Sequence, residues 1–165
     1  MDVVTERPTA PASYHAYATI TGVFVGTLAL AGGLARALGR DPRDQTWLDL
    51  VTLSAATFKA ARTIARDDVT SFIREPFVEG DPRDPDHEHP VQTGDMEQAI
   101  GELVNCSRCV GTWAAAGLAT TQVLAPRFGR ILAWTLACAG INDFLQASFT
   151  ALTRKANELE EHPAL

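Results

Sequence analysis

Two cysteines separated by two residues are the part of this sequence best suited to chemistry. They are Cys106 and Cys109, with Arg108 between them and Gly111 and Trp113 shortly after. If a helix begins near this pair, its free N–H groups and the positive charge of Arg108 favour the thiolate form of the cysteines. The two thiols could share a metal ion or form a disulfide. They could equally be structural, and the sequence leaves these interpretations open.

A metal site at this pair would need further ligands, because structural zinc usually takes four. His87 and His89 lie upstream in a loop rich in Pro and Asp and could complete a set of two cysteines and two histidines. Their spacing matches no zinc-finger pattern. We therefore expect no cofactor, and a bound zinc ion is the alternative. The third cysteine, Cys138, lies alone in an apolar run, and we expect it to be a small buried hydrophobe.

Ionisable residues within apolar segments form a second candidate site. Asp143 and its neighbour Asn142 interrupt the last apolar segment, while Lys59 and Arg62 lie in an earlier one. A charge within a membrane helix is costly and is usually paired with another group. We expect Asp143 to pair with Lys59 or Arg62, either as a structural ion pair or as part of a path for protons or ions. The remaining interpretation is a helix end that places Asp143 near the membrane interface.

Four apolar segments could position these residues as membrane helices. Residues 16–35 are twenty residues without a charge, which is about the length that a helix needs to cross the hydrocarbon core. Residues 47–66 either span the membrane or lie along its surface. Spanning is favoured because Trp47 and Arg66 occur where interface anchors are common. The four segments are residues 16–35, 47–66, 109–125 and 131–153.

These segments predict an all-α fold, a helical membrane bundle of three or four transmembrane helices. The bundle would occupy residues 16–153, between a flexible tail at 1–15 and a charged tail at 154–165. An acidic loop at about residues 67–102 interrupts it, with eleven acidic and two basic residues. No clustered basic face is present, so a nucleic-acid partner is not expected.

Two blocks of residues carry a family resemblance. The first block runs from Asp49 to Phe77 and the second from Gly101 to Trp113. Over residues 47–153 the chain resembles the small membrane family catalogued as domain of unknown function 1360 (DUF1360). The resemblance implies a bacterial multi-pass membrane protein and assigns no activity. The recurring residues that it implies are Lys59, Arg62, Thr70, Arg74, Pro76, Glu102, Cys106, Cys109, Gly111 and Trp113.

Two functional classes follow from these features. The first is a non-enzymatic membrane scaffold or interaction protein, with the lipid bilayer as a partner and a second copy or another protein as further partners. The second is a thiol-dependent membrane protein that uses Cys106 and Cys109. No enzymatic activity is expected, because no nucleophile stands beside a base in a known motif. The resemblance implies the bacterial cell membrane as the location. With four spans, the distribution of Lys and Arg favours both termini and the acidic loop in the cytoplasm, where thiols stay reduced.

Overall fold

Helices dominate the part of the chain that the structure describes. The computed structural model describes residues 11–81, 84 and 87–161, and it confirms the all-α class. Residues 1–10 and 162–165, which belong to the two expected tails, lie outside the described residues. The elements are the α-helices α1 (Tyr14–Ala37), α2 (Trp47–Arg66), α3 (Ser71–Arg74), α4 (Met96–Asn105), α5 (Ser107–Leu124) and α6 (Pro126–Glu161), the 3-10 turns η1 (Pro42–Asp44), η2 (Asp68–Thr70) and η3 (Glu75–Phe77), and the strands β1 (Val78–Glu79) and β2 (His89–Pro90).

The helix α2 begins and ends where the sequence predicted. Thr46 precedes it in extended backbone, and its hydroxyl accepts a hydrogen bond from the Asp49 N–H at 3.2 Å. The Asp49 carboxylate accepts one from the Thr46 N–H at 2.8 Å. This reciprocal capping box satisfies N–H groups that the first turn of a helix leaves without partners. At the other end, the backbone of Asp67 is extended, so α2 ends at Arg66.

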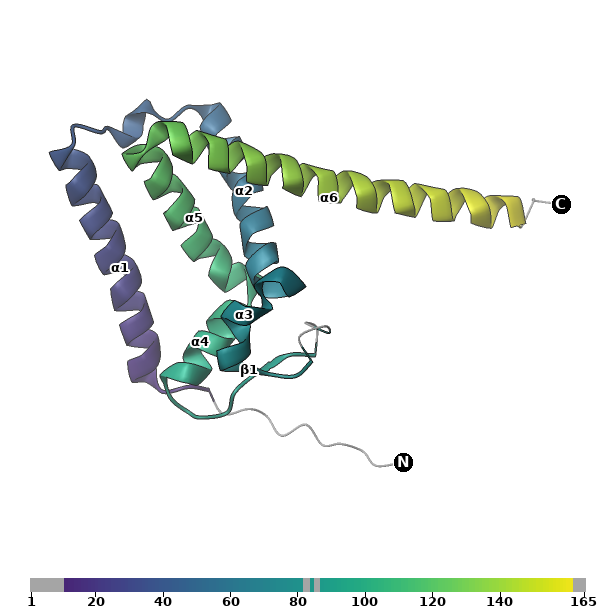
Figure 1. Ribbon diagram of the computed structural model, residues 1–165, viewed down its shortest axis with the longest axis horizontal. Helices are drawn as coiled ribbons and strands as arrows, with labels where there is room; N and C mark the ends of the chain where they lie inside the picture. The colour runs from purple at the N-terminus through teal and green to yellow at the C-terminus, as the bar shows by residue number, and fades with distance from the viewer. Residues whose placement is uncertain (1–10, 82–83, 85–86, 162–165) are drawn as a thin grey trace.

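The last helix differs from the expected fourth span. It begins at Pro126, where proline is well tolerated because the first N–H of a helix has no partner within it. It then continues for 36 residues to Glu161, so that residues 154–161 of the expected tail are helical. In Figure 1, α6 crosses α5 and α2 and its C-terminal half extends away from the other helices. It therefore does not lie alongside them as a fourth parallel span.

Small residues form the core where α6 crosses its neighbours. Ala56 of α2, Leu118 of α5 and Ala133 and Ala137 of α6 are buried together, and alanine allows helices to approach closely. Cys138, next to Ala137, is exposed. The expectation that Cys138 is buried was wrong. The face of α6 that packs against the core carries Ala133 and Ala137, and Cys138 lies one residue beyond Ala137 on another face.

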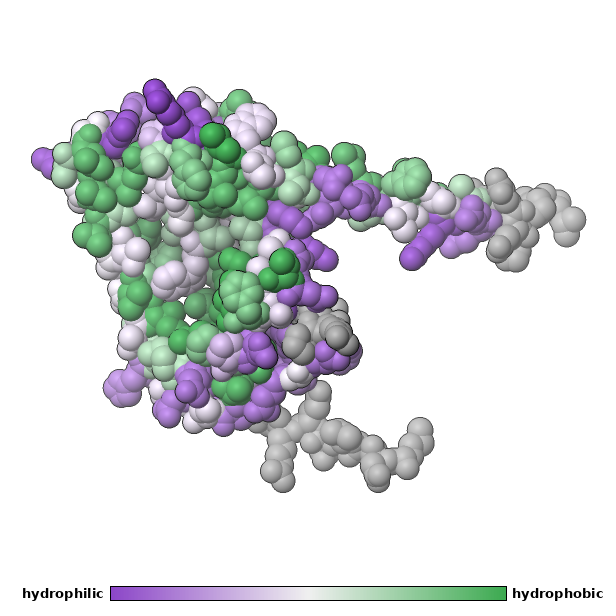
Figure 2. Space-filling view, viewed as in Figure 1, coloured by the Kyte–Doolittle hydropathy of each residue, from purple (hydrophilic) through white to green (hydrophobic). Residues whose placement is uncertain are grey.

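Within the described residues, α1 is the one helix that is long and apolar enough to cross a membrane, judged by length and composition. Little of it is buried against protein, and large apolar side chains such as Val25 and Leu30 are exposed. On the face shown in Figure 2, apolar residues form a band between hydrophilic groups at the two ends of the molecule. The other expected spans are less apolar, because α2 carries charges such as Lys59 and Arg62. Their crossing of a membrane stays a prediction.

The described residues of the expected acidic loop form a folded segment at one end of the helices. It contains α3, the antiparallel pair of β1 and β2, in which Val78 is paired with Pro90, and α4. The start of α1 lies at the same end of the molecule (Figure 1), and Ser13 N–H donates to the Gly94 carbonyl at 2.9 Å. The sequence predicted a loop here, and it did not predict the two strands.

Candidate functional site

Cys106 lies at the junction of two helices. It is the single residue between α4 and α5, and it serves as the N-cap of α5 in extended backbone. Its sulfur accepts a hydrogen bond from the Cys109 N–H at 3.3 Å. The N–H groups at a helix start stabilise negative charge, so this sulfur is placed where a thiolate is favoured.

The sulfur of Cys109 faces that of Cys106 one helical turn later. The two Sγ atoms are 2.6 Å apart, and the Cys109 thiol donates its hydrogen bond to Cys106. Burial on its own would raise the pKa of the Cys106 thiol. The hydrogen bonds from the Cys109 thiol and from backbone N–H groups, with the charge of Arg108, outweigh it and lower that pKa. A disulfide has an S–S length of about 2.05 Å, so the pair needs only a small movement to form one.

The two histidines do not join this pair as ligands. His87 Nδ1 lies 2.8 Å from a carboxylate oxygen of Asp84, and both side chains are exposed. His89 is exposed on β2, where it is paired with Glu79. Across residues 11–81, 84 and 87–161, no group of three or more His, Cys, Asp or Glu side chains could hold a metal ion. The expected set of two cysteines and two histidines is therefore not assembled.

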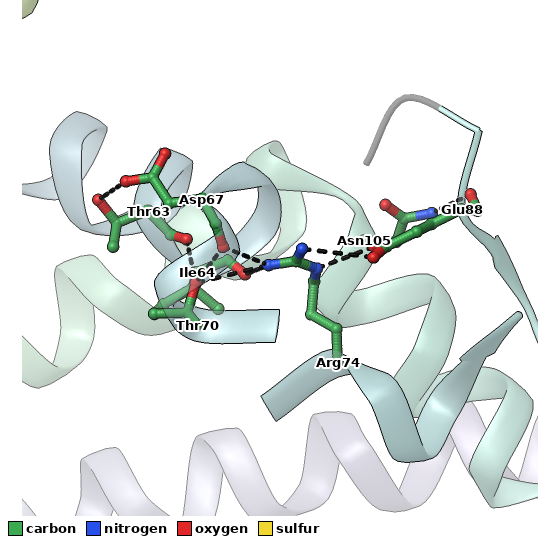
Figure 3. Close-up of polar contacts among 7 residues, drawn as sticks. All are labelled: Thr63, Ile64, Asp67, Thr70, Arg74, Glu88 and Asn105. Atoms are coloured by element: carbon green, nitrogen blue, oxygen red, sulfur yellow. Dashed lines mark hydrogen bonds and ion pairs between the residues drawn. The ribbon is translucent and has the colours of Figure 1, made fainter. Parts of the chain in front are cut away.

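A buried arginine organises the segment that leads to Cys106 (Figure 3). Arg74 is fully buried, and its Nε donates to Glu88 at 2.9 Å. Its Nη1 donates to the backbone carbonyls of Ile64 at 2.9 Å and Asp67 at 3.1 Å. The Glu88 carbonyl accepts a hydrogen bond from Asn105 Nδ2 at 2.7 Å. This network joins the end of α2 to the residue directly before Cys106.

Thr70 extends the same network. Its hydroxyl donates to the Asp67 carbonyl at 2.9 Å and lies 3.4 Å from Arg74 Nη1. Two of the residues implied by the family resemblance, Thr70 and Arg74, therefore hold the turn after α2. Sequence reasoning missed Glu88 and Asn105, because nothing in the sequence distinguishes Glu88 from the ten other acidic residues of residues 67–102.

Three more of the residues implied by the resemblance lie where helices pack. Glu102 on α4 accepts hydrogen bonds from Tyr17 of α1 and, at 3.0 Å, from Gln98. Trp113 of α5 packs edge to face on Phe24 of α1, with ring centroids 5.0 Å apart. A Cβ on Gly111 would lie 3.6 Å from the Ala61 side chain of α2, while Pro76 is exposed within η3.

Lys59 lies between two carboxylates in the second candidate site. Its Nζ is 2.9 Å from Asp143 of α6 and 3.6 Å from Asp67. Arg62 lines the same pocket of about 400 Å³. Neither Arg62 nor the exposed Asn142 forms an ion pair or a side-chain hydrogen bond with another described residue. The structure thus brings Asp143 to Lys59 rather than to Arg62.

We expect the Lys59–Asp143 pair to give a small coupling between α2 and α6. Replacing Asp143 with alanine should lower the thermal midpoint of the purified protein, and Lys59→Ala in the same chain should restore part of the loss. Asp143 is 39% exposed, so solvent screening should limit the coupling to about 0.5–1 kcal/mol. Asn142→Ala is the matched control and should leave the midpoint unchanged. Strictly additive losses in the double-mutant cycle would show that the pair does not interact.

Comparisons with known proteins agree with the family resemblance. Residues 52–149 match the family described as Protein of unknown function (DUF1360). The UPF0713 protein YngL of Bacillus subtilis (strain 168) is 26% identical over 103 residues, which are 62% of this chain and 79% of the relative. The Sporulation protein YjcA of the same strain is 30% identical over 105 residues, 60% of this chain and 88% of the relative. No solved structure matches.

Proposed function

The chain belongs to the family described as Protein of unknown function (DUF1360), and from that premise we propose that it is a bacterial integral membrane protein whose Cys106 and Cys109 interconvert between a dithiol and a disulfide. One observation carries the thiol part of the proposal. The two sulfurs are 2.6 Å apart at the start of α5, and the pKa of Cys106 is lowered there.

The chemistry is thiol–disulfide exchange with a partner disulfide, either a small molecule or a protein. The Cys106 thiolate attacks one sulfur of that disulfide, a mixed disulfide forms, and the first partner thiolate leaves. Cys109 loses its proton to solvent and attacks Cys106, which releases the second partner thiolate. The chain is oxidised by two electrons and the partner disulfide is reduced to two thiols. Cys106 is the attacking thiol because its thiolate form is favoured.

Trapping the mixed disulfide tests this order of attack. In detergent-solubilised protein carrying Cys138→Ser, oxidised glutathione should yield the Cys106–Cys109 disulfide and two glutathione thiols per chain. Cys109→Ser should accumulate glutathione on Cys106, detected by mass spectrometry. Cys106→Ser should form no internal disulfide and react more slowly. The rate for Cys106 should reach its plateau at a lower pH than that of an ordinary thiol, because its pKa is lowered.

An inert pair would contradict the thiol proposal. If neither cysteine reacts with oxidised glutathione while Cys138 of the wild-type chain does, the non-enzymatic scaffold is the better interpretation. Faster reaction at Cys109 than at Cys106 would reverse the assigned roles and contradict the argument from the helix start.

For the membrane part, we propose that α1, α2 and α5 cross the bilayer. The three helices run side by side in Figure 1, and the acidic segment lies at one end of them. Lys59 on α2 has two carboxylate partners within the protein, Asp143 and Asp67, and pairing of this kind lowers the cost of a charge in a spanning helix. Large apolar side chains are exposed on α1 and α2; examples are Val23, Val25, Leu30, Leu48, Val51 and Phe58.

We expect the chain to remain in the membrane pellet after a carbonate wash. Val25→Lys with Leu28→Lys should reduce the amount inserted, because each lysine near the centre of a span costs roughly 2.5–3.5 kcal/mol. Leu38→Lys at the end of α1 is the control and should behave as the wild type, since a lysine there reaches the interface. Recovery of the wild-type chain in the wash supernatant would contradict the membrane proposal.

A further inference from the structure

A pocket between α2 and α5 combines three positive charges with an apolar floor. It has a volume of about 340 Å³, and it lies beside the junction that holds Cys106. Arginines from the last turns of α2 and the first turn of α5 line it, together with a hydroxyl from α5 and apolar side chains from α2. These residues are Arg62, Arg66, Arg108, Ser107, Phe58 and Ala61.

The charge of this pocket is unusual for the chain. Among the residues that the structure describes, no acidic side chain lines it, although the whole chain has a net charge of −6. The neighbouring pocket, by contrast, balances its bases with Asp67 and Asp143. Arg62 and Arg108 form no ion pair or side-chain hydrogen bond with any residue that the structure describes. Two guanidinium groups are thus available to an anion.

We propose that this pocket binds the phosphate group of an anionic phospholipid. Guanidinium groups bind phosphate with paired, charge-assisted hydrogen bonds, and Arg62 and Arg108 approach the pocket from different helices. A basic pocket between membrane helices at the level of the headgroups is suited to an acidic lipid. Phe58 and Ala61 then contact the hydrocarbon of the same molecule.

The position of the pocket along the helices supports a lipid over a free anion. α2 ends at Arg66 and α5 begins at Ser107, so these arginines lie at the end where both helices meet the acidic segment. If α2 and α5 cross the bilayer, that end is at the headgroup level. The inference therefore rests on the membrane part of the proposed function and is independent of the cysteine chemistry.

Lipid binding to the purified full-length chain in a non-ionic detergent tests the proposal. Native mass spectrometry should show phosphatidylglycerol bound in preference to phosphatidylcholine. Arg62→Gln with Arg108→Gln should weaken phosphatidylglycerol binding by about tenfold or more, as expected when hydrogen bonds to a charged group are lost. Arg62→Lys with Arg108→Lys keeps the charge and should retain part of the binding, which separates recognition from misfolding.

Three controls make the result decisive. Arg36→Gln with Arg43→Gln removes two bases at the other end of the helices and should leave binding unchanged. Equal weakening by this pair would overturn the proposal in favour of general charge attraction, as would equal binding of phosphatidylcholine. Pocket-dependent binding of inorganic phosphate as tight as that of phosphatidylglycerol would overturn the lipid assignment. Cys106→Ser with Cys109→Ser should bind the lipid normally, so failure of the thiol proposal is recognised separately.

Discussion

Replacing Arg74 with methionine should destabilise the protein by about 3–5 kcal/mol, the loss typical of removing one partner of a buried ion pair. Arg74 is fully buried, and the side chain of Glu88 is 2% exposed, so the substitution leaves an unpaired carboxylate out of water. The backbone carbonyls of Ile64 and Asp67 lose their donor as well. The thermal unfolding midpoint of the purified chain should fall, and the peptide after α2 should gain hydrogen exchange.

A second substitution separates the ion pair from general packing. Arg74→Met with Glu88→Met removes both charges and should recover part of the loss, because two apolar side chains need no buried counter-charge. Arg154→Met, at an exposed position of α6, is the control and should have little effect. A double variant that loses as much as the two single variants together would contradict the buried pair.

Gly101→Ala should also be strongly destabilising. An added Cβ would lie 2.3 Å from the backbone carbonyl oxygen of Phe77 and 3.1 Å from the side chain of Pro90. Backbone has to shift to accommodate it, and overpacking of this kind costs about 1–3 kcal/mol. Since Gly101 lies on α4 shortly before Cys106, the reactivity of that thiol should change together with the unfolding midpoint.

Gly117→Ala on α5 is the matched control, and its expected effect is a gain in stability instead of a loss. A Cβ there would meet nothing within 4 Å. Alanine is favoured over glycine inside a helix by roughly 0.5–1 kcal/mol, so the midpoint should rise slightly. A fall for both glycines would show that the loss at Gly101 does not come from its close contact with Phe77.

Local signals explain what the sequence could predict. The apolar segments that become α1 and α2 are each continuous in the sequence, so their length and composition locate both helices. The two cysteines are also local, because residues three apart on a helix share a face. Their position before α5 followed from the apolar run that begins at Cys109.

Contacts between distant segments explain what it could not. The ion pair of Arg74 with Glu88 joins two parts of an acidic segment, in which residue type does not identify the partner. The short pairing of Val78 with Pro90 involves two residues in each strand and has no periodicity to detect. At the crossing of α6 and α2, a Cβ added to Gly140 would lie 3.3 Å from the Ala55 carbonyl oxygen, and this close approach is a property of the packed helices.

The redox state of Cys106 and Cys109 in intact cells most directly tests the central claim, which is that these two cysteines interconvert between a dithiol and a disulfide. After acid quenching and alkylation, trypsin cuts at Arg108, between the two cysteines, so a disulfide would join residues 84–108 to residues 109–127. This linked pair should appear when cells are treated with a disulfide oxidant and disappear after reduction. Two alkylated, unlinked peptides under every condition would contradict the account.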